Sequence, residues 1–490
     1  MTELVGQDTP SEELSFWQKV GFGVGDIYGG GSGIIISFYY LYFLTDIVRI
    51  NPALAGTVIL ISKVYDAITD PFEGVLTDRT RTPLGRRRPY LLSGILLVFL
   101  SFFTLWYPVD FSEEWQRFVF VVFSYLFFST VVSIVMTSYN ALASELTLDY
   151  DERTSISSYR IFFSTFSSIL SAVLPLEIVK LFPTVRQGYI GMGLIFGAFF
   201  ALPFIATVAV TREREAFQRP PMPFSWRRTF IEPFRVRTFV TALMMYLLAF
   251  VAMDAVSSIV IYYMKYYLQR GSEANYVSGT LLVAQVVALP FYVWLSRRTS
   301  KRTGYIVGAL IWMATMPLSF LIGPGAPGFA IYVFAVLVGL GTGGIVVMIY
   351  AIFPDIPDVD ELKTGQRREG IYSAMVTFMR KLSSAGALFL VSTSFSLAGY
   401  IQPVERIVDG TEQLIEQPQS DAFLLVLRLI FVVIPLVFLA IALRFAFEYP
   451  LTSQVHDRLC TVLSFRRAGE PEPPEIEEEA ERLEKELIGE

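Results

Sequence analysis

The chain of 490 residues has very little cysteine and histidine, with one of each. The single cysteine, Cys460, excludes an intrachain disulfide. The single histidine, His456, leaves no histidine-based metal site and no histidine-dependent catalytic triad. The sequence also lacks a Walker-type phosphate loop, so ATP-driven transport is not indicated. With no nucleophile and base pair and no metal-ligand cluster, we expect neither an enzyme nor a bound cofactor.

Charge is also scarce, because only 17% of the residues are charged whereas soluble domains carry about 25%. Hydrophobic residues make up 53% of the chain, 42 residues are phenylalanine, and the mean hydropathy is +0.51. These values predict a multi-pass protein of the cell membrane, which is the cytoplasmic membrane in a prokaryote. Much of the acidic excess lies in residues 470–490, and nothing suggests nucleic-acid binding. The N-terminus has neither a basic nor an apolar signal region, so no cleaved signal is expected.

Long apolar stretches predict about twelve transmembrane helices, since roughly twenty apolar residues cross a bilayer. They lie near residues 17–45, 52–77, 89–108, 116–145, 157–181, 187–210, 238–268, 274–296, 303–323, 328–353, 370–398 and 421–447. Arginine and lysine gather in the even-numbered connections, which places those connections and both termini in the cytoplasm. The expected fold is therefore an all-α integral membrane protein.

Internal repetition divides the predicted helices six and six. LTDRTRTPLGRRRPYLLSG after the second helix is echoed by LSRRTSKRTGYIVG after the eighth, and a second pair of similar segments follows the fourth and tenth. Two related halves are the plan of many secondary transporters. The expected divisions are a cytoplasmic N-terminal segment, a first helix bundle, a cytoplasmic linker, a second bundle and an acidic cytoplasmic tail: 1–16, 17–210, 211–237, 238–447 and 448–490.

The second predicted helix carries charges inside its apolar stretch. Lys63, Asp66, Asp70 and Glu73 follow spacings of three and four residues, which place them on one helical face. Two unpartnered carboxylates at mid-membrane cost about 5 to 7 kcal/mol on insertion scales. A bound cation offsets that cost, and these oxygens together with the Thr69 hydroxyl suit Na⁺ or H⁺. The alternative is a Lys63–Asp66 pair that only fixes helix packing.

Four sequence blocks form a recognisable pattern, and the strongest is YDAITDP followed by GVLTDRTRTPLGRRRPYLL. The others are GFGVGD with FYYLYFLTDIV, then SYNALASELTLDYDERTSISSYR, then DVDELKTGQRREGIYSAMVTFMRKL. Together these blocks resemble the glycoside-pentoside-hexuronide:cation symporter family, which includes melibiose permease, within the major facilitator superfamily. The resemblance covers both halves in order. It implies the major facilitator fold and cation-driven symport by alternating access.

The resemblance also implies roles for particular residues. Those that match the family's cation site, including the helix-four hydroxyl of melibiose permease, are Asp66, Thr69, Asp70 and Ser133. The residues matching the coupling lysine of helix eleven and the substrate-side arginine of helix five are Lys381 and Arg160. The residues resembling the superfamily's cytoplasmic gate are Asp78, Arg79, Gly85, Arg86 and Arg87.

The sequence departs from melibiose permease at the sugar site. The family's helix-one aspartate aligns near Gly30, with Asp26 about one turn earlier, and the helix-four aspartate aligns with Met136. The nearby tryptophan position aligns with Asn140, and Tyr28 is an aromatic candidate for the same cavity. The resemblance therefore supports the cation site, and the galactoside site differs. For the glycines of helix one, close packing of helices is an alternative to a role in substrate binding.

Two further intramembrane charges lie outside these motifs. For Asp254 in the seventh helix, a solute-lining role and simple polar packing remain equal alternatives, and Arg380 beside Lys381 is expected at an interface or in the lining.

We expect a monomeric symporter that couples Na⁺ or H⁺ to a small solute, a sugar or glycoside, across the lipid bilayer. One alternative keeps the fold and moves a lysophospholipid or another amphiphile. Another is a membrane sensor that binds a solute without transporting it.

Overall fold

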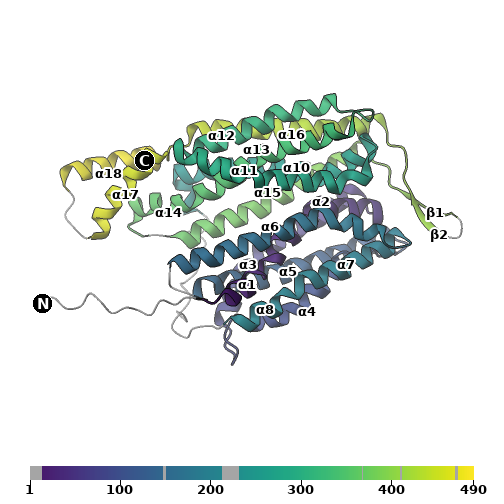
Figure 1. Ribbon diagram of the computed structural model, residues 1–490, viewed down its shortest axis with the longest axis horizontal. Helices are drawn as coiled ribbons and strands as arrows, with labels where there is room; N and C mark the ends of the chain where they lie inside the picture. The colour runs from purple at the N-terminus through teal and green to yellow at the C-terminus, as the bar shows by residue number, and fades with distance from the viewer. Residues whose placement is uncertain are drawn as a thin grey trace. The chain divides into compact units, whose positions relative to one another are not determined.

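The computed structural model describes residues 14–146, 150–211, 231–366, 368–408, 411–468 and 473–489. Within these residues, 12 helical stretches are long and apolar enough to cross a membrane (Figure 1). Each overlaps one of the predicted stretches, which confirms the expected number of spans. Apolar length is a local property of the sequence, and this is why the spans were predictable.

One element departs from the all-helical prediction. Strands β1 (Val404–Val408) and β2 (Thr411–Ile415) form an antiparallel hairpin in which Val404 pairs with Ile415 (Figure 1). The sequence carries Asp-Gly between these two short segments, and that residue pair favours a two-residue hairpin turn. The hairpin lies in a connection between two spans.

Contacts divide the chain into two units, of which the first comprises Met1–Met222 together with Gln402–Gln417. Its helices are α1 (Phe16–Gly23), α2 (Asp26–Tyr42), the π-helix η1 (Phe43–Ile47), α3 (Pro52–Arg79), α4 (Arg88–Leu105), α5 (Glu114–Leu146), α6 (Tyr150–Lys180), α7 (Val185–Ala201) and α8 (Pro203–Val210). Within this unit α2 packs on α6 and α3 packs on α5.

Small residues bring α2 and α6 together. A Cβ placed on Gly30 or Gly31 would clash with α6 serines, and Ser167 Oγ donates to the carbonyl of Ile27 at 2.7 Å. Close approach and serine-to-backbone hydrogen bonds are how membrane helices associate where the surrounding lipid supplies no hydrophobic driving force. This contact supports a packing role for the glycine run.

The second unit comprises Pro223–Ile401 together with Pro418–Glu490. Its main helices are α10 (Arg237–Tyr262), η4 (Tyr263–Tyr267), α11 (Ala274–Arg298), α12 (Lys301–Thr315), α13 (Gly328–Ile352), α14 (Ile356–Thr364), α15 (Glu369–Leu397), α16 (Asp421–Glu448), α17 (Ser453–Ala468) and α18 (Pro474–Leu487). Short 3-10 turns are η3 (Glu232–Arg235), η5 (Gly271–Glu273), η6 (Met316–Leu321) and η7 (Phe353–Asp355). Helices α17 and α18 both lie in the segment that the sequence predicts to be an acidic tail.

The first spanning helix of each unit ends in the same local structure. A π-helical turn, η1 or η4, is followed by a non-glycine residue with positive φ, Arg49 at 60° and Gln269 at 56°. In both cases the backbone N–H of the next residue donates a hydrogen bond to a carbonyl of the preceding helix. The bonds run from Ile50 to Leu44 and from Arg270 to Met264. Each feature of the second unit lies 220 residues after its counterpart. This agreement supports the repetition inferred from the sequence.

Candidate functional site

The predicted cation-binding residues gather between α3 and α5. Ser129 Oγ donates to Asp66 Oδ1 at 2.6 Å, and one helical turn further on Ser133 Oγ donates to Asp70 Oδ1 at 2.6 Å. Both acids project from one face of α3 and both serines from one face of α5, because residues four apart lie one above the other. The structure therefore brings Asp66, Asp70 and Ser133 together.

Ser129 is a member of this cluster that sequence reasoning missed. Its spacing of four residues from Ser133 is a signal that identifies it once α5 is known to face α3. Thr69, the remaining predicted ligand, donates its hydroxyl to the carbonyl of Tyr65 in its own helix at 3.1 Å. Its oxygen still has acceptor capacity.

Lys63 forms the ion pair that the sequence allowed as an alternative. Its Nζ atom lies 3.1 Å from Asp66 Oδ2, and Asp66 is 2% exposed. Asp66 thus uses one oxygen for Lys63 and the other for Ser129. The Lys63–Asp66 ion pair and a bound cation are compatible with each other. Both would place a positive charge beside the Asp66 carboxylate.

The donor set is chemically suited to a small, hard cation. Carboxylate and hydroxyl oxygens are the ligands that such ions prefer, whereas thiolate and imidazole favour transition metals. Among the described residues no group of three histidine, cysteine, aspartate or glutamate side chains is placed to hold a metal ion. The oxygen atoms of Asp66, Asp70, Ser129 and Ser133 therefore fit Na⁺ or a proton.

A second cluster contains three of the predicted solute-side residues. Arg160 on α6 donates from Nε to Asp26 Oδ2 at 2.9 Å and from an Nη atom to Asn140 Oδ1 at 2.6 Å. Its guanidinium also lies 4.8 Å from the ring centroid of Tyr139. Asp26 is the first residue of α2. It therefore lies at the break between α1 and α2, which both belong to the first spanning helix.

Side chains from other helices donate hydrogen bonds to the backbone carbonyls at the end of α1, where the spanning helix is interrupted. Breaking the helix disturbs the regular backbone hydrogen bonding, and Phe22 O accepts from Gly25 N–H at 3.1 Å. Thr207 Oγ1 donates to Gly21 O at 3.0 Å, and the Tyr139 hydroxyl donates to Phe22 O at 2.8 Å. Gly25 admits Tyr139, because a Cβ there would lie 2.6 Å from the tyrosine ring. The break is therefore held in place, and it positions Asp26 beside Arg160.

Tyr28 occupies a different environment from the one the sequence suggested. It is fully buried, and its ring packs against those of Phe128, Phe200 and Phe204 at centroid distances of 6.5, 5.8 and 6.0 Å. These contacts favour a packing role for Tyr28 over contact with a solute. Met136 does lie near Asp26, since a Cβ on Gly29 would be 2.6 Å from both side chains.

The second unit holds a buried ion pair that the sequence did not predict. Arg380 on α15 donates from both Nη atoms to Asp254 on α10, at 2.6 and 2.8 Å, and its guanidinium lies 4.6 Å from the Phe250 ring centroid. Arg380 lies 220 residues after Arg160, the same offset that relates the two helix ends. In the sequence, this offset from Arg160 was the signal that could have identified Arg380 as a functional candidate. Lys381 is the next residue of α15 and is half-buried.

The gate-like residues are described only in part. The side chains of Asp78 and Arg79 lie outside the described residues. Gly85 has φ 105° and closes a tight turn in which Thr82 and Gly85 exchange backbone hydrogen bonds at 3.0 and 3.2 Å. Only glycine adopts that conformation readily. Arg86 is buried, and Arg87 immediately precedes α4.

A charged network lies between α14 and the start of α15. Asp360, which is fully buried, accepts hydrogen bonds from Arg368 at 2.6 and 2.7 Å and from the Tyr372 hydroxyl at 2.9 Å. Arg368 also reaches Glu232 at 2.5 Å. The Asp360 hydrogen bonds raise the pKa of Arg368. Hydrogen bonds to charged groups are stronger than those between neutral groups. This network therefore connects η3, α14 and the start of α15 firmly.

Twelve apolar spans, together with acids inside them that pair with hydroxyl or guanidinium groups, define the class of multi-pass membrane proteins. The family model described as "MFS/sugar transport protein" matches residues 21–453. This family match and the relatives named as symporters identify a transporter within this class. The chain belongs to this family, which confirms the predicted resemblance to the glycoside-pentoside-hexuronide:cation symporters of the major facilitator superfamily.

Individual relatives differ in what they carry. An uncharacterized symporter of Synechocystis sp. is 28% identical, over 94% of this chain and 99% of its own. The isoprimeverose transporter of Lactiplantibacillus pentosus is 24% identical over 78% and 81%. The sodium-dependent lysophosphatidylcholine symporter 1-A of Danio rerio is 22% identical over 97% and 93%. Among solved structures, a bacterial ferroportin homologue in an inward-facing state has TM-score 0.61 at 14% identity, covering 89% of this chain and 99% of that chain, which shows the fold alone.

Proposed function

We propose that the protein is a secondary active symporter in which Na⁺ or H⁺ binds Asp66 and Asp70 and drives the uptake of a small solute by alternating access. The observation that carries this proposal is the double pairing of acids on α3 with serines on α5. Neutralising these carboxylates lowers the cost of enclosing them, which couples cation binding to a conformational equilibrium. Relatives named as symporters support the coupling.

The solute is proposed to contact the cluster of Asp26, Asn140 and Arg160 in the first unit. In the second unit, Asp254 and Lys381 are proposed as residues that take part in coupling. Carboxylate, amide and guanidinium groups around one point bind sugar hydroxyls. A sugar or glycoside is the first candidate, supported by the family description and by the isoprimeverose transporter. A lysophospholipid is the second, supported by the lysophosphatidylcholine symporter, which matches a larger share of the chain.

Uptake into proteoliposomes tests the proposal. Isoprimeverose and lysophosphatidylcholine are offered separately, under an inward Na⁺ gradient or an inward proton gradient. Asp66→Asn and Asp70→Asn should each abolish accumulation against a gradient. The matched control is Asp110→Asn, which removes an exposed acid that pairs with Arg186 at 3.2 Å. Normal accumulation by both α3 variants would contradict the assignment of the cation site.

A further inference from the structure

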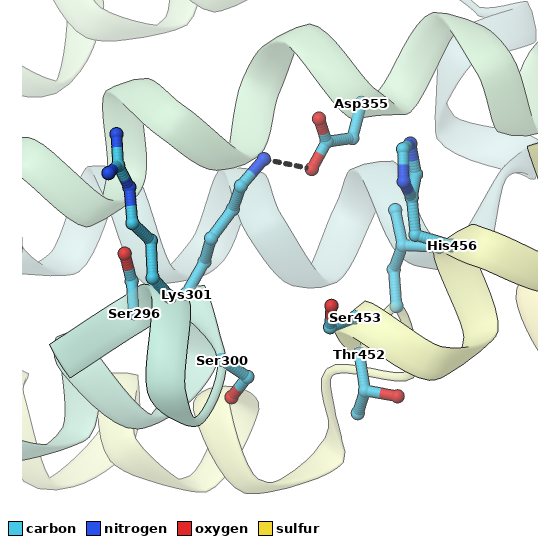
Figure 2. A pocket seen from close by; sticks show the side chains of 9 residues that line it. Ser296, Ser300, Lys301, Asp355, Thr452, Ser453 and His456 are labelled. Atoms are coloured by element: carbon cyan, nitrogen blue, oxygen red, sulfur yellow. Dashed lines mark hydrogen bonds and ion pairs between the residues drawn. The ribbon is translucent and has the colours of Figure 1, made fainter. Parts of the chain in front are cut away.

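A cavity of about 230 Å³, lined mainly by residues with polar or charged side chains, lies in the second unit, outside the clusters assigned above (Figure 2). It forms where α11 ends and where α12 and α17 begin, with η7 as a further wall. A single water molecule needs only about 10–15 Å³ of accessible volume. The cavity therefore has room for a group of phosphate size together with bound water.

Cationic groups stand on opposite sides of this cavity. Lys301 Nζ is held by Asp355 at 2.5 Å and by the Ala351 carbonyl at 2.9 Å. Figure 2 shows this pair facing His456 and Ser453. His456 Nε2 lies 3.6 Å from Asp358 Oδ2, and that contact raises the pKa of the imidazole although partial burial opposes the change. The cavity thus becomes more positive as the pH falls.

Further donors in the cavity are available to a ligand. Within the described residues, Arg297 and Ser453 make no side-chain hydrogen bond or ion pair. The N-termini of two helices also lie at the cavity. They are the start of α12, which is capped by Ser300, and the start of α17 at Ser453. Helix N-termini carry partial positive charge and favour anions.

We propose that this cavity binds a phosphate group. Guanidinium, ammonium and hydroxyl donors together with two helix N-termini match a multiply charged oxyanion. Asp355 is the acid in the lining, and its charge is matched by Lys301. A sugar is less suited, because the nine lining residues include no phenylalanine, tyrosine or tryptophan for stacking.

The position of the cavity identifies two sources for that phosphate. It lies at the ends of membrane-spanning helices, and the neighbouring Arg298 stacks over the half-exposed Trp294 ring at 4.8 Å. Tryptophan and arginine at such positions mark the bilayer interface, where basic pockets between helix ends bind phospholipid head groups. The ligand is therefore the head group of an anionic lipid or a soluble phosphate compound, and it is independent of the transported solute.

Thermal unfolding of the purified full chain tests the site, since a ligand that binds only the folded state raises Tm. In an uncharged detergent, inorganic phosphate should raise Tm in a saturable way. Arg297→Gln should weaken binding roughly tenfold or more, and Ser453→Ala should weaken it several-fold. Arg298→Gln removes an adjacent charge outside the lining and should leave the affinity unchanged. No saturable rise, or equal weakening in Arg297→Gln and Arg298→Gln, would overturn the proposal.

Nanodiscs distinguish the two sources. If a lipid head group fills the cavity, phosphatidylglycerol raises Tm through Arg297 and suppresses the phosphate effect, whereas phosphatidylcholine alone preserves it. If the ligand is soluble, the phosphate effect is equal in both lipids.

Sulfate, whose charge is constant in this range, tests the titration of His456. The groups that face this imidazole are Asp355, Asp358, Lys301 and Cys460. Sulfate affinity should rise as the pH falls, and His456→Gln should remove that rise. A pH-independent affinity in the unmodified chain would remove His456 from the site.

Discussion

If the coupling cation binds Asp66 as proposed, replacing Lys63 by glutamine should make the protein bind that cation more tightly. Lys63 Nζ lies 3.1 Å from Asp66 Oδ2, so a cation on the same carboxylate lies within about 6 Å of the ammonium group. The two positive charges repel each other. Because the lysine side chain is only 19% exposed, water screens this repulsion weakly.

The size of the effect follows from Coulomb's law. At an effective dielectric constant of about 20, unit charges about 6 Å apart interact by about 3 kcal/mol, which corresponds to roughly a hundredfold in affinity. Relaxation of the site reduces this figure, so a tenfold to hundredfold decrease in the apparent Kd is expected. Without the cation, the variant should be less stable than the unmodified protein, because a buried carboxylate has lost its charged partner.

The assay is thermal unfolding against Na⁺ at constant ionic strength, repeated across pH to follow protons. The control is Lys180→Gln, which removes a lysine that also pairs with an acid one turn away, Glu177 at 2.7 Å, but is well exposed. That variant should keep the original cation dependence. An unchanged or higher apparent Kd in Lys63→Gln would refute the proximity of the lysine to the cation.

Three other predictions follow from the described contacts. Arg380→Gln should destabilise the protein by about 3–5 kcal/mol, because Asp254 keeps a buried charge and loses both donors, and adding Asp254→Asn should recover most of the loss. Gly30→Ala should cost about 1–3 kcal/mol, because the new methyl group meets α6. Since its contact with Asp358 raises the pKa of His456, stabilisation of α17 should be complete below the unfolded pKa of about 6.5 and should be lost as the pH rises through the folded pKa.

Each of these has a control. Chemical unfolding measures the first two, and Gly33→Ala should be nearly neutral because no atom lies within 4 Å of its Cβ position. Equal losses at Gly30 and Gly33 would mean that lost helix flexibility, not the α6 contact, is the cause. Hydrogen exchange measures the third: protection of α17 should fall as the pH rises above about 6.5, and a fall of the same size in His456→Gln would contradict it. If Asp254→Asn rescues nothing, the Arg380 effect does not come from the ion pair.

Much of the candidate cation site was predictable before any fold was known. Asp66, Thr69 and Asp70 follow helical spacing within an apolar stretch, and both spacing and hydropathy are properties of neighbouring residues. The family resemblance added Ser133. Ser129 was missed, because serine is common in membrane helices and only the packing of α5 on α3 selects this one.

The amino-acid sequence alone predicted the twelve spans and a second helix that carries charge, because apolar content and residue spacing are set by neighbouring residues along the chain. It also predicted two repeated halves. Which charges meet depends on how helices pack. Asp26 pairs with Arg160, and Asp254 pairs with Arg380. The residues of each pair lie more than a hundred positions apart, so no pattern among neighbouring residues predicts which acid meets which arginine. The enclosure of Tyr28 and the cavity beside Lys301 likewise arise from several helices at once.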